Sequence, residues 1–340
     1  MRRVWQRRAG AASLGGAASL ARGARGRWRV ATLLLATALG AVSLAGCSVG
    51  ARDTGTHVVA GGASTGIYYS YGGAIADQLA QEGFDITVAA TGGSVDNLFR
   101  VGRGEATLGF AQADAAADAI AGVGAFDEPL PVEGVARVYD EYVQVVVPAD
   151  SPAVEIPDLA GLRVSVGELH SGVTVIADRV LRAAGVAEGD FVSARLGIDD
   201  SVDALARGEI DAFFWVGGIP TPGIDALSET TPVKILPISP ETVEKVNSGH
   251  AGVYRLADFP LGIYGTDVAV ETMTVPNYLI TSADADPRIV FEMTRALFES
   301  RTEIADTVPA AALLDRRQAI FTGPVPLHEG AANYYVRSRK

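Results

Sequence analysis

The sequence predicts an α/β protein with parallel sheets that is built as two similar halves. Apolar, β-branched runs alternate along the chain with stretches of helical spacing, as in proteins whose strands are joined by crossover helices. A weak internal repeat relates SVDNLFRVGRGEATLGF (94–110) to SVDALARGEIDAFF (201–214). Each copy follows a Ser/Gly/Thr-rich turn that opens a helix, at 64–66 and at 170–174. We therefore expect two lobes that present helix N-termini to a shared cleft; chance similarity of two helix ends is the alternative.

Residues 1–46 are predicted to be a signal peptide and not part of the fold. They carry eight arginines and no acidic residue, and they end in an apolar run at 30–46. That run is shorter than the ~20 residues of a membrane-spanning helix. It closes with LAGC, a lipobox pattern, so we expect Cys47, the only cysteine in the chain, to be lipidated. An uncleaved membrane anchor is the alternative for the leader, and a buried or reactive free thiol is the alternative for Cys47.

The charge of the exported part excludes some partners. Eight of the 28 basic residues lie in the leader, which leaves 20 basic residues against 40 acidic ones. So acidic a chain is not expected to bind nucleic acid or an anionic membrane surface. The length that remains exceeds one average domain and favours two lobes.

The elements follow one another in a regular order after a polar tether at 47–56. In the first half we expect strands and helices in alternation, at 57–61, 68–83, 84–90, 94–105 and 106–112. Two β-branched runs follow at 134–139 and 142–147. In the second half the alternation returns at 162–167, 171–184, 200–209 and 210–218. The last part is predicted to hold strands at 267–273 and 278–282 and one long amphipathic helix at 287–306. Segments near 140–147 and 266–273 are expected to cross between the lobes as a hinge.

Three hydroxyl-bearing helix entries predict an anion site in the cleft. They are GGASTG (61–66), TGGS (91–94) and HSGVT (170–174). The free N–H groups and the partial positive charge of a helix start bind anions. The first entry lacks the Gly-Lys-Ser/Thr ending of a P-loop, which argues against a nucleoside triphosphate. Plain capping, worth about 1 kcal/mol, is the alternative for any single turn.

A catalytic or metal site has little support in the sequence. The four histidines are scattered, and there is no HExxH motif and no Cys/His cluster. Asp199, Asp200 and Asp203 are interpreted as a solvated helix start. Asp114 with His170 is the one titratable pair expected near the cleft, so an exported enzyme stays open as an alternative. No cofactor and no metal are expected.

Several motifs together resemble the TAXI-type solute receptors, the extracytoplasmic binding proteins of one branch of the TRAP transporters. They are the lipobox, the Gly/Thr-rich turn with its Tyr pair, TGGSVDNLFRVGRGEATLGFAQAD, DLAGLRVSVGELHSGV and LARGEIDAFFWVGGIP, spread over about residues 57–285. The resemblance implies a type II periplasmic-binding-protein fold, with two α/β lobes joined by two crossing strands around a ligand cleft. Lobe 1 would comprise 57–143 and 268–340, and lobe 2 would comprise 144–267.

The resemblance also implies a function. The protein would be a monomeric lipoprotein, held at the outer face of the cytoplasmic membrane by the lipid on Cys47. It would capture a small anionic solute, a glutamate-like amino acid or a dicarboxylate, and deliver it to a TRAP permease driven by an ion gradient. A lipoprotein sensor for a membrane receptor kinase is the alternative.

The ligand-binding positions implied by the resemblance come from five segments. They are Ser64, Thr65, Gly66 and Tyr68; Thr91, Gly92, Gly93, Ser94 and Asn97; Gln112 and Asp114; His170, Ser171, Gly172, Val173 and Thr174; and Trp215, Gly218 and Pro220. Core packing and ligand stacking are both open for Trp215. The chain departs from the family pattern at Ser70, where proline is frequent, and at His170 to Val173, where Gly-Ser-Gly-Thr is frequent. Glutamate itself is therefore not transferred as the ligand.

Overall fold

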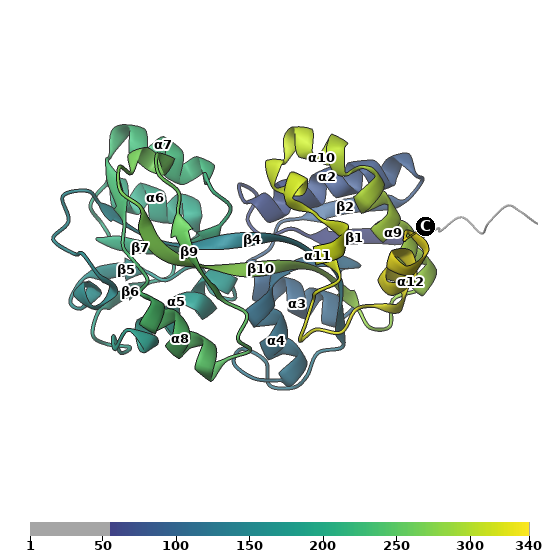
Figure 1. Ribbon diagram of the computed structural model, residues 1–340, viewed down its shortest axis with the longest axis horizontal. Coiled ribbons are helices and arrows are strands. Elements are labelled where there is room, and N and C mark those ends of the chain that lie inside the picture. Colours follow the sequence, from purple (N-terminus) through teal and green to yellow (C-terminus); the bar gives the residue numbers. More distant parts are fainter. Residues whose placement is uncertain (1–54, 340) are drawn as a thin grey trace, which may run out of the picture. The chain divides into compact units, whose positions relative to one another are not determined.

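The computed structural model describes residues 55–339 (Figure 1). The predicted signal peptide, Cys47 and most of the tether lie outside these residues. Within the described part, ten strands form one mixed sheet in the order β2-β1-β3-β10-β4-β7-β5-β6, with β8 beside β4 and β9 beside β10. Helices cover both faces of this sheet (Figure 1).

The first half of the sheet is a parallel unit in which each strand is followed by a helix. Its elements are β1 (Thr56–Ala60), α2 (Ile67–Gln81), β2 (Asp85–Ala89), α3 (Ser94–Gly102), β3 (Leu108–Gln112) and α4 (Ala113–Ala121). Helix α2 buries Tyr68, Tyr71, Ile75 and Leu79 at the spacing of one helical face. The apolar spacing visible in the sequence therefore sets which face of α2 packs on the sheet.

The second half repeats this arrangement. Its elements are β5 (Arg163–Ser165), α5 (Gly172–Ala183), β6 (Val192–Ala194), α6 (Ile198–Ala206) and β7 (Ala212–Gly217). The local order β6-β5-β7-β4 matches β2-β1-β3-β10 in the first half. The weak sequence repeat thus corresponds to two copies of one βαβαβ unit, with its SVD triplets on α3 and α6.

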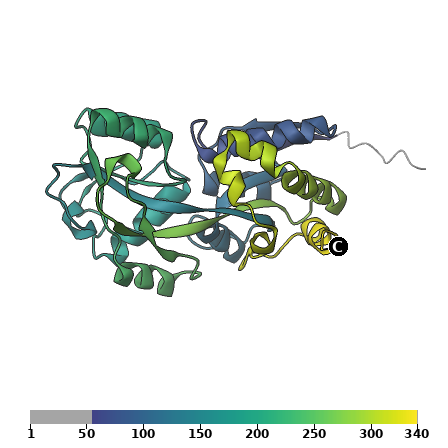
Figure 2. The same cartoon turned by 45° about the horizontal axis from the view of Figure 1, so that its top comes forward.

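Two long strands connect the halves. Strands β4 (Val132–Pro148) and β10 (Val270–Ser282) run antiparallel and pair along most of their length. Figure 2 shows them crossing side by side from one half to the other. The two runs expected at 134–139 and 142–147 are one continuous strand, and so are those at 267–273 and 278–282. Pro276 lies inside β10, next to a register shift at Asn277. Proline is tolerated within a strand at such an irregularity.

The remaining elements are helices, strands and 3₁₀ helices outside the two βαβαβ units. They are the helices α7 (Pro222–Thr230), α8 (Pro240–Gly249), α9 (Pro287–Glu299), α10 (Arg301–Thr307), α11 (Arg316–Ala319) and α12 (Glu329–Arg337), the strands β8 (Val233–Ile235) and β9 (Arg255–Phe259), and the 3₁₀ helices η1 (Ile156–Leu159), η2 (Ile263–Gly265) and η3 (Pro309–Leu313). The prediction of one long helix at 287–306 is wrong, because a break at Ser300 separates α9 from α10. The break lets Ile304 reach the core of the first half, where it is buried.

Buried apolar side chains stabilise each layer. One cluster lies under α2 and the C-terminal helices α9 to α12, and another lies under α6 and α7. A third, larger cluster joins α3 and α4 of the first half to α5 and α8 of the second. Burying each Val, Leu or Phe of these clusters is worth about 1.5–3 kcal/mol. Packing therefore supplies the stability of a chain that has no disulfide in its described part.

Candidate ligand-binding cleft

A cavity lies between the two halves of the sheet. Its walls are formed by the loops that follow the carboxyl ends of β1, β2, β5 and β7, together with side chains of β3 and β4. In open α/β sheets this edge is where ligands bind, because the crossover loops diverge there. The topology thus places the predicted cleft between the two copies of the repeat.

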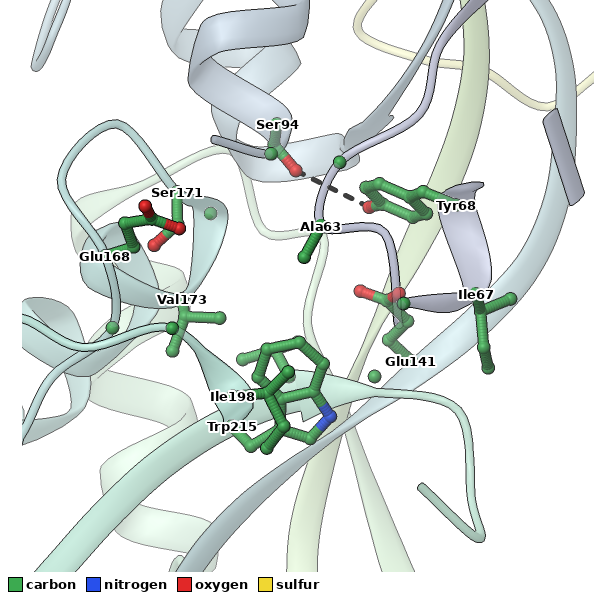
Figure 3. A pocket seen from close by; sticks show the side chains of 18 of the residues that line it. Ala63, Ile67, Tyr68, Ser94, Glu141, Glu168, Ser171, Val173, Ile198 and Trp215 are labelled. Carbon is green, nitrogen blue, oxygen red and sulfur yellow. Dashed lines mark hydrogen bonds between the residues drawn. The ribbon is translucent and has the colours of Figure 1, made fainter. Parts of the chain in front are cut away.

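Five helices begin at the cavity wall. The lining residues include the N-terminal ends of α2 (Gly66–Tyr68), α3 (Gly93, Ser94), α5 (Ser171–Val173), α6 (Gly197, Ile198) and α7 (Thr221, Pro222). The first-turn N–H groups of a helix have no partner inside the helix and carry a partial positive charge. Helices α2 and α5 have no acidic residue in their first turn, whereas α3 and α6 begin with aspartates. The starts of α2 and α5, one from each half, thus carry no acidic residue in the first turn, although Glu168 lies beside the start of α5 (Figure 3).

The two predicted serine hydroxyls also have structural partners. Ser171 caps α5, since its Oγ accepts a hydrogen bond from the Thr174 N–H at 3.2 Å. Ser94 Oγ accepts from the Gln112 N–H at 3.2 Å and lies 3.4 Å from the Tyr68 hydroxyl. Both hydroxyls thus fix the helix starts that surround the cavity.

One wall of the cavity is apolar. Figure 3 shows Trp215 at its base, with Ile198 and Val173 close by, and Ile67 on the far side. The Trp215 ring is held by a hydrogen bond of 3.0 Å from its Nε1 to Thr221 Oγ1. Trp215 is half-buried, so part of its ring is free to contact a ligand.

Glu141 brings a buried carboxylate to the opposite wall. This residue lies on the crossing strand β4 and is only 4% exposed. Its Oε2 accepts a hydrogen bond from Gln112 Nε2 at 2.9 Å, and its Oε1 accepts from the Tyr139 hydroxyl at 3.0 Å. Burial raises the pKa of the Glu141 carboxyl to about 7, and the Asp114 charge adds to this shift, whereas the polar side chains of Gln112, Tyr139 and Asn277 oppose it.

The two halves touch at the rim of the cavity. Thr65 donates a hydrogen bond of 3.0 Å to Asp199, and the Asp96 N–H donates one of 3.2 Å to the His170 carbonyl. A Cβ atom placed on Gly172 would lie 1.9 Å from Gln112 Oε1. The described conformation is therefore one in which the halves are closed on each other.

Most of the predicted site residues lie in this cavity wall. Those that line it are Thr65, Gly66, Tyr68, Gly92, Gly93, Ser94, Gln112, Ser171, Gly172, Val173, Trp215 and Gly218. Those that do not are Ser64, Thr91, Asn97, Asp114, His170, Thr174 and Pro220. Thr91 and Asn97 support the wall from behind, because Thr91 Oγ1 accepts from the Gly62 N–H and Asn97 Nδ2 donates to the Phe110 carbonyl.

Asp114 lies away from the cavity in a buried ion pair. Arg179 Nη1 and the Tyr254 hydroxyl each donate a hydrogen bond of 2.7 Å to Asp114 Oδ2. Arg179 also pairs with Asp118. His170 is exposed, with its ring beside Phe99. Asp114 and His170 are thus not brought together as a titratable pair.

Sequence reasoning missed further residues of the wall, two of them inside the first helix entry at 61–66. They are Gly62, Ala63, Ile67, Glu141, Gly167, Glu168, Leu196, Gly197, Ile198, Val216, Gly217, Thr221 and Pro222. A signal existed for Glu141, since an acidic residue stands inside the apolar run of a crossing strand. The described residues hold no cluster of three or more metal-ligating side chains. None of their helices is long and apolar enough to span a membrane.

A family model described as the NMT1-like family matches residues 59–337. The chain belongs to the NMT1-like family. Among solved structures, it is similar to MatC from Rhodopseudomonas palustris with bound malate, at 17% identity and a TM-score of 0.52, over 83% of this chain and 96% of that one. This likeness concerns the fold alone. The predicted fold class, the two-lobed type II periplasmic-binding-protein fold, is confirmed.

Two further similar structures are binding proteins. The alkanesulfonate-binding protein SsuA from Xanthomonas axonopodis pv. citri, bound to MOPS, matches at 16% identity and a TM-score of 0.47, over 84% of this chain and 85% of that one. The GluR0 ligand-binding core from Nostoc punctiforme, in complex with L-glutamate, matches at 14% identity and a TM-score of 0.44, over 75% of this chain and 96% of that one.

Proposed function

We propose that this protein is an extracytoplasmic receptor that captures a small carboxylate-bearing solute between its lobes. The observation that carries the proposal is the meeting of helix N-termini from both lobes at one cavity. Backbone N–H groups at the starts of α2 and α5 suit a carboxylate without a dedicated arginine. Each lobe supplies part of the site, so solute binding would favour the closed form.

The expected partner of the receptor is a TRAP permease of the TAXI type. The motifs at 61–73, 91–114, 158–173 and 205–220 support this assignment, and membership of the NMT1-like family agrees with a solute-binding role. In this proposal the lobes are 57–143 with 268–340, and 144–267, and the receptor acts as a monomer. Uptake by cells that carry the receptor and its permease should stop when the ion gradient is dissipated and should persist when ATP is depleted at a constant gradient.

The location follows from the leader. We propose that residues 1–46 are removed and that a lipid on Cys47 holds the protein to the outer face of the cytoplasmic membrane through the 47–56 tether. Replacing Cys47 by Ala should move the protein from the membrane fraction to the soluble fraction, because one lipid-modified residue carries the anchor. The two fractions are compared by immunoblotting. Retention of the variant in the membrane would instead support an uncleaved helix at 30–46.

We propose binding without catalysis, which membership of the NMT1-like family supports. The one titratable pair expected from the sequence is separated, since Asp114 is paired with Arg179 and His170 lies outside the cavity wall. No serine of the wall has a histidine or lysine as a hydrogen-bonded base in the described part.

Thermal unfolding in the presence of candidate solutes tests the proposed function. The purified protein is heated with amino acids, hydroxy acids, keto acids, dicarboxylates or sugars. A true ligand at 100 times its Kd adds about 2.7 kcal/mol of stability, which is a clear shift in Tm. We expect the hits to share a carboxylate. Hits confined to sugars, or no hit in any class, would contradict the proposal.

A further inference from the structure

The cavity carries negative charge without a counter-charge. Glu141 and Glu168 line its wall, and the described lining residues include no lysine, arginine or histidine. Glu168 is exposed and solvated, but Glu141 is buried. A buried carboxylate without a cation costs free energy unless a partner arrives with the ligand. The other buried acid near it, Asp114, has Arg179 as its partner.

The hydrogen bonds of Glu141 leave room for a donor from the ligand. A carboxylate has about four acceptor positions. Two are used by Gln112 and Tyr139 within the described residues. The neighbouring Gln112 Oε1 is also buried in the cavity wall and has no hydrogen-bond partner. Gln112 Oε1 thus lacks a donor, and Glu141 has acceptor positions beyond the two that Gln112 and Tyr139 fill.

The opposite chemistry is found at the helix starts. The start of α5 lines the cavity, and Figure 3 shows Ser171 and Val173 across the cavity from Glu141. The first N–H groups of a helix have no partner inside the helix and suit an anionic group. Figure 3 shows the apolar side chains of Ile198 and Trp215 between the two ends, and Ile67 beyond Glu141. A solute that satisfies all three parts carries a carboxylate, a protonated amine and an apolar group.

We propose that the solute is a zwitterionic amino acid with an uncharged side chain, and that Glu141 selects it by accepting hydrogen bonds from its ammonium group. This inference rests on the proposed function and names its ligand class. The ammonium supplies the missing counter-charge of Glu141. A second carboxylate on the solute finds no basic side chain in the described wall, so dicarboxylates and glutamate are disfavoured.

The charge state of Glu141 links binding to pH. The groups that face it are the Gln112 amide on β3, the Tyr139 hydroxyl on β4, the Tyr68 hydroxyl on α2, the Asn277 amide on β10 and the Asp114 carboxylate on α4. The tyrosines stay neutral, because burial raises the pKa of Tyr68 and of Tyr139. Since the Glu141 pKa is about 7 in the free protein, an ammonium ligand must displace a proton at lower pH. Its affinity should therefore fall as the pH drops from 8 to 5.

Calorimetric titration of the purified protein with matched solutes tests the inference. The probes are L-alanine, L-valine, L-leucine and L-phenylalanine, the 2-hydroxy acids of the same carbon skeletons, and malate and L-glutamate. We expect at least one amino acid to bind at least about 30-fold more tightly than its hydroxy-acid counterpart. The hydroxy acid leaves the buried charge of Glu141 without a partner, and this costs affinity. The Glu141→Gln variant should reduce that ratio to within about threefold.

A neighbouring acid on the same strand gives the matched control. Asp140 is paired with Arg137 and does not line the cavity, so Asp140→Asn should leave every affinity unchanged. Equal binding of a hydroxy acid and its amino acid to the wild-type protein would overturn the inference while the proposed function stands, as would tight binding of malate. An unchanged ratio in Glu141→Gln would also overturn it. Absence of binding to every probe would overturn the inference, and the wider solute panel would then decide the proposed function separately.

Discussion

At the scale of single residues, the position of Glu141 has an energetic cost that the free protein must bear. The carboxyl is buried on β4, and burial raises its pKa from 4.5 to about 7. The folded protein thus holds the Glu141 proton more tightly than the unfolded chain does. The contribution of Glu141 to the free energy of unfolding is therefore most favourable below pH 4.5, and it falls as the pH rises to about 7.

Replacing Glu141 by Gln should remove this pH dependence. Between pH 5 and pH 8 the wild-type protein should lose about 2–3 kcal/mol relative to the variant, which follows from the pKa shift. Urea denaturation of both proteins at the two pH values gives their free energies of unfolding. The contributions of all other titrating groups cancel when the variant is subtracted from the wild type. A difference between the two proteins that does not change with pH would show that Glu141 ionises normally.

The predicted site residues line the cavity where the local backbone decides their position, and they lie away from it where distant partners decide. Ser171 and Gly172 line the cavity because a Ser-Gly turn opens α5, and that turn is visible in the sequence. Asp114 follows β3 directly and was expected in the cleft. Its side chain turns instead to Arg179 and Tyr254, which lie 65 and 140 positions further along the chain. No local pattern indicates such a partner.

At the scale of elements, the start of α5 must approach β3 closely for the lobes to close. Gly172 leaves no room for a side chain, since a Cβ would lie 1.9 Å from Gln112 Oε1 and 2.8 Å from Ser94 Oγ. The same helix start supplies N–H groups to the cavity. Closure and anion binding therefore depend on one contact between lobes.

The variant Gly172→Ala should bind solute at least about tenfold more weakly, because closing the lobes would force a clash of about 1–3 kcal/mol. Its thermal stability without solute should change little if the lobes open slightly. Gly249→Ala is the control, because nothing lies within 4 Å of its Cβ position. Calorimetry gives both affinities. Equal Kd values for the two variants would mean that α5 does not approach β3 in the bound form.

Helices α4 and α5 are joined by the ion pair of Asp114 and Asp118 with Arg179. Replacing Arg179 by Met should destabilise the protein by about 3–5 kcal/mol, because two partly or fully buried carboxylates lose their cation. Arg182→Met is the control on the same helix, where the arginine is exposed. Urea denaturation measures both. A loss below 1 kcal/mol for Arg179→Met would show that this contact is open in solution.

At the scale of the whole molecule, two copies of a βαβαβ unit face each other across β4 and β10. The alternation and the repeat in the sequence predict this architecture, because strand–helix periodicity is local. The continuity of each crossing strand was not predicted, since polar residues and Pro276 interrupt the apolar pattern of β4 and β10. Pairing between two segments 130 positions apart decides that continuity, and it brings Glu141 into the cavity.

Fluorescence of Trp215 tests the central claim, solute capture in the cavity between the lobes, most directly. Trp215 is the one tryptophan of the described residues, and its ring lines the cavity. In a titration with a solute that raises the Tm, we expect a saturable blue shift of the emission, with the Kd found by calorimetry and no such shift in Trp215→Phe. Emission that stays unchanged while calorimetry reports binding would place the solute elsewhere and contradict the claim.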